Sequence, residues 1–135
     1  MKKFFPTLLA MLFCSTIMAQ SVTVVLSQNK CKSNKISELK KMMEENGAPI
    51  LNDLVDQGKL LNWGVLTHAW GDEHNWNVFY VAESHSKFLE AWDEFIRRVM
   101  ENDPDANEKI GEICWEHKDS IYTQIMGSSI SESGD

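Results

Sequence analysis

Along the first half of the chain, the spacing of apolar residues changes from a strand pattern to a helical one. Residues 21–27 are rich in β-branched side chains and predict a strand. From residue 35 to residue 57 the apolar positions recur at the helical period. Gly47 and Pro49 interrupt this stretch, and proline removes a backbone donor, so we expect two helical pieces with a break or kink near Gly47. Gly58 is expected to end the second piece.

Residues 58–83 have the pattern of an aromatic β-hairpin and contain three of the five tryptophans. A five-residue loop, 71–75, would place Trp70 opposite Trp76. In that register one face has the character of helix-packed core: Leu61, Trp63, Val65, Thr67, Phe79 and Val81. The other face mixes apolar and hydrogen-bonding groups: Asn62, Leu66, His68, Trp70, Trp76, Val78 and Tyr80. Such a face needs a second sheet or a ligand to cover it, although a one-residue slip would exchange the two roles.

The second half begins with Ser84 as the N-cap of a helix that ends near residue 102. A short helical segment over 108–117 and a last strand over 120–126 follow. The order strand, helix, strand, strand, helix, strand predicts an α+β fold, the ferredoxin-like βαββαβ plan, with a four-stranded antiparallel sheet and its helices on one face.

The two ends of the chain differ from this pattern. Residues 1–19 combine Lys2 and Lys3 with a short apolar core and small residues before Gln20, which indicates a cleaved bacterial signal peptide and a secreted or periplasmic protein. The apolar stretch is too short for a membrane span. Residues 20–126 form the expected domain, and the Ser- and Gly-rich segment 127–135 is expected to be disordered.

The net charge limits the classes of binding partner, and the cysteine content allows a disulfide. The formal net charge is −7, and cleavage would remove two lysines and leave −9, so nucleic acid and anionic membranes are poor candidates. Cleavage also leaves only Cys31 and Cys114. An oxidising compartment permits a disulfide between them, but the sequence leaves two free thiols equally open.

The element order and one phrase, from Pro49-Ile50-Leu51 through Gly58-Lys59-Leu60 to Trp63-Gly64-Val65-Leu66, resemble the dimeric α+β barrel superfamily. The similarity is to its secreted bacterial branch, most of whose members have no assigned activity. The resemblance implies a homodimer in which two ferredoxin-like subunits pack their open sheet faces into a barrel whose lumen binds ligands. The superfamily includes cofactor-free monooxygenases, isomerases and haem-binding members, and fold alone does not choose among them.

The mixed hairpin face supplies the candidate chemistry. A lumen lined by Asn62, Leu66, His68, Trp70, Trp76 and Tyr80 would be aromatic-walled, with His68 as a general base and Tyr80 as a hydrogen-bond donor. The alternative, which we favour from sequence, is that these residues only pack a dimer interface. His68, Asp72, Glu73 and His74 form a solvated turn more simply than a metal site, and His85 and His117 match no haem motif. We therefore predict neither a metal nor a cofactor.

The leading functional hypothesis from sequence is a secreted binding or accessory protein for a small hydrophobic or aromatic molecule. The alternatives are a cofactor-independent monooxygenase or isomerase that uses His68 and Tyr80, and a structural envelope protein.

Overall fold

The structure is a computed structural model that describes residues 21–70 and 73–127. Its strands are β1 (Thr23–Cys31), β2 (Asn62–Thr67), β3 (Trp76–Ala82) and β4 (Cys114–Thr123). Its helices are η1 (Ser33–Lys35), α1 (Ile36–Met42), η2 (Met43–Gly47), α2 (Ala48–Asp56), α3 (His85–Asn102) and α4 (Ala106–Ile113). The predicted signal peptide and most of the predicted disordered tail, residues 128–135, lie outside the described residues.

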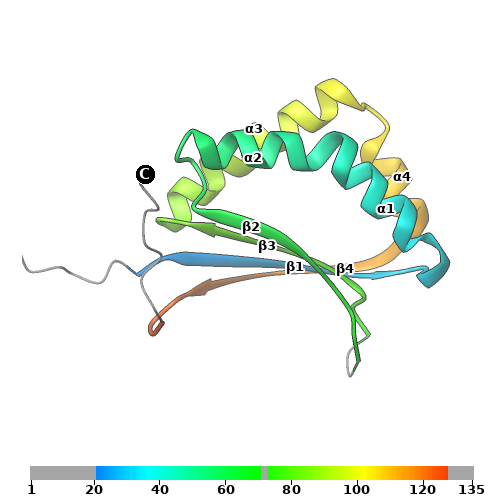
Figure 1. The fold of residues 1–135 in the computed structure, drawn as a ribbon, viewed down its shortest axis with the longest axis horizontal. Coiled ribbons are helices and arrows are strands. Elements are labelled where there is room, and N and C mark those ends of the chain that lie inside the picture. Colours follow the sequence, from blue (N-terminus) through cyan, green and yellow to red (C-terminus); the bar gives the residue numbers. More distant parts are fainter. Residues whose placement is uncertain (1–20, 71–72, 128–135) are drawn as a thin grey trace, which may run out of the picture.

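The four strands form one antiparallel sheet in the order β2-β3-β1-β4. All the helices lie on one side of this sheet, and the other side carries no element of the described chain (Figure 1). This is the ferredoxin-like α+β fold, as predicted from the element order. Because a sheet buried on one side alternates apolar and polar positions, the register decides which side chains face the helices.

The observed hairpin register differs from the predicted one. Thr67 lies opposite Trp76 and Trp63 lies opposite Tyr80, so the hairpin is shifted by three residues from a Trp70–Trp76 pairing. An odd shift exchanges the faces of one strand relative to the other. Five strand residues change sides as a result: Trp76, Val78 and Tyr80 face the helices together with Trp63, and Phe79 and Val81 face away.

Asn75 joins the start of β3 to the end of β1. Its side chain accepts a hydrogen bond from the Cys31 amide (2.8 Å) and donates one to the Cys31 carbonyl (2.7 Å), and its own amide donates to the Asn29 carbonyl (3.0 Å). These bonds continue the β3–β1 ladder one position beyond Trp76, where a side chain replaces the backbone partner. A five-residue loop was expected, but β2 ends at Thr67, and the connection is therefore longer.

The helical stretch is irregular near Gly47, as predicted, but the chain does not break there. The chain passes from α1 through one π-helical turn, η2, into α2, and every cap between them has helical dihedral angles. Pro49 lies in the first turn of α2, where its missing N–H costs least. The π-helical turn before it is the local departure from regular α-helix. Gly58 ends α2 as predicted, with a left-handed φ of 68° that a side chain would oppose.

The last strand also differs from its prediction. β4 begins at Cys114, six residues before the predicted start, and α4 ends at Ile113 instead of continuing to His117. The polar run from Glu116 to Asp119 carries no alternation that would indicate a strand, but it pairs with the extended end of β1. A disulfide joins Cys31 to Cys114 and so connects the end of β1 to the start of β4.

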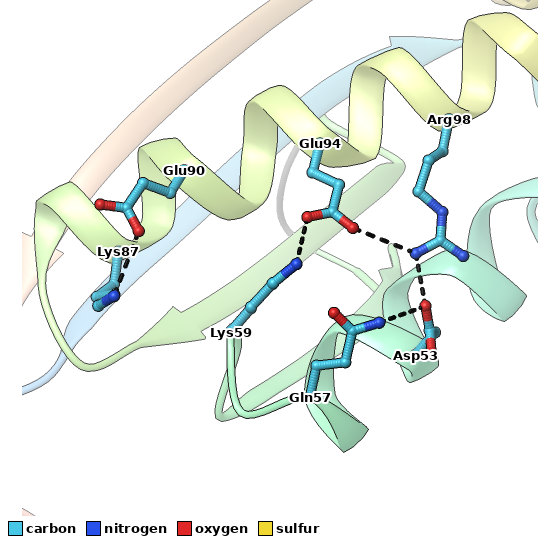
Figure 2. A network of polar contacts seen from close by, with 7 residues as sticks. All are labelled: Asp53, Gln57, Lys59, Lys87, Glu90, Glu94 and Arg98. Carbon is cyan, nitrogen blue, oxygen red and sulfur yellow. Dashed lines mark hydrogen bonds and ion pairs between the residues drawn. The ribbon is translucent and has the colours of Figure 1, made fainter.

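Helix α3 begins as predicted, with the Ser84 hydroxyl accepting a hydrogen bond from the Lys87 amide (3.3 Å). A polar network then joins α3 to α2 and the turn after it (Figure 2). Arg98 donates to Asp53 (2.6 Å) and lies 3.6 Å from Glu94, and Glu94 also pairs with Lys59. Between residues 21–70 and 73–127, no helix is both long and apolar enough to cross a bilayer.

Candidate functional site

A cavity of about 540 Å³ lies between the sheet and the helices. Its floor comes from β1, β3 and β4, and its walls come from α1, η2, α3 and α4. This volume lies within the range of small-molecule sites in proteins. The cavity therefore belongs to a single chain and lies on the helix side of the sheet, not on the open face.

The inner walls are aromatic and aliphatic. Trp92 on α3 packs edge-on against Tyr80 (ring centroids 5.5 Å apart) and lies close to Phe95 (5.4 Å). Trp76 and Val78 complete the floor beside them, and both are buried. Trp76, Val78 and Tyr80 point toward the helices because the observed register places these positions of β3 on the helix side of the sheet. The result is a rigid aromatic surface against which a flat apolar molecule can pack.

Tyr80 combines burial with an unused polar group. The residue is 4% exposed and lines the cavity, and within the described chain its hydroxyl forms no hydrogen bond. Burial raises the pKa of Tyr80 well above its usual range, and the negative charge of Asp119 raises that pKa further. The hydroxyl therefore stays protonated at neutral pH and can donate or accept one hydrogen bond.

β4 contributes a polar edge to the cavity. His117 and Asp119 face the helix side opposite Asn29 and Ser27 of β1, and the His117 Nε2 lies 3.1 Å from the Asp119 Oδ2. Their side chains are 64% and 53% exposed, so the cavity opens to solvent along β4. The arrangement places a carboxylate and an imidazole at the mouth and a phenol hydroxyl deeper inside.

Two further carboxylates lie on the rim, and each has a lysine partner. Asp103, between α3 and α4, pairs with Lys109 (2.7 Å). Glu116 on β4 pairs with Lys30 (3.3 Å), which also contacts Glu73 (2.6 Å). Hydrogen bonds to Glu73 and Glu116 raise the pKa of Lys30, and a hydrogen bond to Asp103 raises the pKa of Lys109, so both lysines stay charged at neutral pH.

The residues proposed from sequence as one site do not lie together. Trp76 and Tyr80 line the cavity, whereas Asn62 and Leu66 lie on the open face of the sheet. His68 lies one residue beyond β2 and is exposed. Trp70, also beyond β2, is 89% exposed.

Sequence reasoning did not identify most of the cavity. Trp92, Phe95 and Met43 line the cavity but were not among the residues proposed as a site, and His117 was placed in a helical segment. One signal was available: in β3, Asn77 separates Trp76 from Val78, so the all-apolar set of that strand is Trp76, Val78, Tyr80 and Ala82. An all-apolar set is expected on the face of the sheet that the helices cover, and these four residues are buried there.

The open face of the sheet carries two apolar rows that cross the strands. Tyr122, Val24 and Val81 form one row, and Leu26 and Phe79 form the next. Gly64 ends the second row, and its missing side chain leaves room for the Phe79 ring, whose Cε1 lies 2.5 Å from where a Cβ would be. Beyond these rows the face becomes polar, with Lys118, Gln28 and Asn77.

Within residues 21–70 and 73–127, no group of three or more His, Cys, Asp or Glu side chains is arranged to hold a metal ion. The turn considered above includes Asp72, which lies outside these ranges.

Comparison with solved structures identifies the fold. The structure is similar to a dimeric ferredoxin-like protein from an uncultured marine organism, with a TM-score of 0.64 and 12% identity over 83% of this chain and 94% of that one. It is similar to a NIPSNAP family protein of unknown function from Agrobacterium tumefaciens (TM-score 0.61, 17% identity, 84% and 96% covered). A putative antibiotic biosynthesis monooxygenase from Nitrosomonas europaea also matches (TM-score 0.56, 10% identity, 82% and 96% covered). No family model and no curated protein matches the sequence. The chain therefore has the ferredoxin-like α+β fold of these proteins, as its sequence pattern predicted.

Proposed function

We propose that this protein binds a small hydrophobic or aromatic molecule in the cavity between its sheet and its helices, as a secreted accessory protein. The observation that carries the proposal is the 540 Å³ cavity itself, whose walls are aromatic and whose few polar groups converge at one end. Ligand sites in proteins have this composition. Secretion is supported by the signal-like residues 1–19 and by the Cys31–Cys114 disulfide, since such bonds persist in oxidising compartments.

The experiment is to purify the protein from the periplasm, release any bound molecule by denaturation and identify it by mass spectrometry. Ser27 lies on the cavity floor between Val78 and Asp119, so Ser27→Phe fills the space without removing core side chains. We expect this variant to fold and to copurify without the molecule. Ser86→Phe, at an exposed position in the first turn of α3, is the matched control and should retain it. Equal retention by both variants would contradict binding in the cavity.

A second candidate function, a cofactor-independent monooxygenase or isomerase, is favoured by the His117–Asp119 pair beside the cavity. A hydrogen-bonded carboxylate orients an imidazole for general base catalysis, and the protonated Tyr80 hydroxyl could stabilise a developing oxyanion. The neighbour described as a putative antibiotic biosynthesis monooxygenase agrees with this class. In this candidate His117 replaces His68 as the base, because His68 does not line the cavity.

We also propose that the protein forms a homodimer through the open face of its sheet. The two apolar rows on that face have no covering element in the described chain, and neighbours of this fold include dimeric ferredoxin-like proteins. An apolar sheet face of this kind is stabilised when a second sheet covers it.

A further inference from the structure

The charged residues that line the cavity are acidic. The lining includes Asp103, Glu116 and Asp119, and no lysine or arginine of the described chain is part of it. The lysines that pair with Asp103 and Glu116 approach from outside the lining. A carboxylate or phosphate ligand would therefore enter a negative field without a cationic partner inside the cavity.

Asp119 differs from the other two acids. Among residues 21–70 and 73–127, its side chain pairs with His117 and with no lysine or arginine. Its negative charge acts on the buried Tyr80 hydroxyl, which places that charge within electrostatic reach of the cavity interior. Asp119 is thus the acid whose charge is available to a ligand.

The aromatic walls favour the same sign of charge. Trp76, Trp92 and Trp115 all line the cavity, and the faces of indole rings attract cations. Trp115 is 65% exposed and lies on β4, the same strand that carries Asp119. The Tyr80 hydroxyl, buried and without a partner in the described chain, can accept a hydrogen bond from an ammonium group.

We propose that the ligand is an apolar or aromatic molecule bearing a protonated amine, held between Asp119, the Tyr80 hydroxyl and the tryptophan faces. This inference rests on the proposed function, since it requires that the cavity binds a small molecule. It deepens that function by assigning the class of ligand: cationic amines are selected, and molecules of the same shape with a carboxylate are rejected.

The test uses three probes of nearly the same shape, 2-naphthylmethylamine, 2-naphthylmethanol and 2-naphthoate, titrated into the protein by calorimetry. We expect the amine to bind about tenfold more tightly than the alcohol, and the carboxylate to bind more weakly than the alcohol. Asp119→Asn should reduce the preference for the amine to about twofold and leave the alcohol unchanged. Asp56→Asn, at an exposed α2 position away from the cavity, removes the same formal charge and should keep the preference.

A second measurement needs no variant. The preference of the unmodified protein for the amine should decrease between about 20 mM and about 500 mM salt, while binding of the alcohol should not weaken. If the three probes bind equally, or if the carboxylate binds best, the assignment of ligand class is wrong and binding in the cavity stands. If Ser27→Phe binds every probe as the unmodified protein does, the proposed site itself is wrong.

Discussion

Cys31 is bonded to Cys114, and the two half-cystines are also neighbours in the β1–β4 ladder. The ladder changes register between Lys30 and Cys31, so the disulfide lies at the point where the pairing of the two strands is irregular. Cys31 is 1% exposed, and Cys114 lines the cavity. The bond therefore holds the start of β4, and with it the polar edge of the cavity, against the end of β1.

Replacing both cysteines by serine is expected to lower the free energy of unfolding by about 4 kcal/mol, because the bond links residues 83 positions apart and restricts the unfolded chain. Urea titration followed by tryptophan fluorescence measures the loss. The unmodified protein with a reductant present should show a similar loss. An unchanged midpoint in both experiments would contradict a disulfide in the native protein.

Asn75→Ala should destabilise the protein by about 2 kcal/mol, because it leaves the amide and carbonyl of Cys31 without their side-chain partners. Thermal unfolding followed by circular dichroism measures this. Asn62→Ala, at an exposed position at the start of β2, is the control and should change stability much less. If the two variants lose equal stability, the hydrogen bonds between Asn75 and Cys31 do not stabilise the sheet.

The network between α2 and α3 predicts a loss of stability in acid. The hydrogen bond from Arg98 lowers the pKa of Asp53, and that from Lys59 lowers the pKa of Glu94. A carboxyl whose pKa is lower in the folded state stabilises the protein above its unfolded pKa, and that contribution is lost as the pH falls through the folded value. The stabilisation should therefore be present at neutral pH and disappear as the pH falls below about 4.

Glu94→Gln tests this prediction. The variant should unfold at lower urea concentration than the unmodified protein at pH 7, and the difference should be nearly absent at about pH 2.5. The effect should be small, because the charged side chains of the network are partly exposed to solvent. Asp93→Asn, an exposed acid on the same helix, provides the comparison. A difference that persists unchanged in acid would mean that Glu94 acts through packing and not through its charge.

Phe79→Glu should convert a dimer to a monomer, because it places a charge in the apolar rows of the open face. Light scattering coupled to size-exclusion chromatography gives the mass directly. Leu89→Glu, on the exposed side of α3, should leave the dimer intact. If the unmodified protein is already a monomer at micromolar concentration, the open face is not a dimer interface.

Tyr80→Phe should weaken binding of 2-naphthylmethylamine about tenfold and change the stability of the protein by less than about 0.5 kcal/mol. The hydroxyl has no hydrogen-bond partner in the described chain, so its removal breaks no internal bond. Calorimetry and thermal unfolding measure the two effects. His68→Ala should alter neither, since His68 lies outside the cavity lining, and a loss of binding in that variant would restore the sequence-based site.

Local sequence signals predicted the order of the elements and several of their ends. Ser84 can satisfy a free helix amide and Gly58 can adopt a left-handed backbone conformation, and both properties belong to the residue itself. The alternation in residues 62–67 likewise placed Trp63 and Val65 toward the helices. A half-buried strand shows this alternation of apolar and polar residues, and the fold class could therefore be predicted from the sequence.

The site was decided by tertiary structure. In β3 both alternating sets contain large apolar side chains, and the pairing of β3 with β1 and β2 places Trp76 and Tyr80 toward the helices and Phe79 away from them. His117 and Asp119 lie in a polar segment whose strand conformation depends on pairing with distant β1. The sequence by itself determined which elements form, because capping and periodicity are local. The cavity depends on register and on contacts between distant segments, which exist only once the sheet and helices have packed.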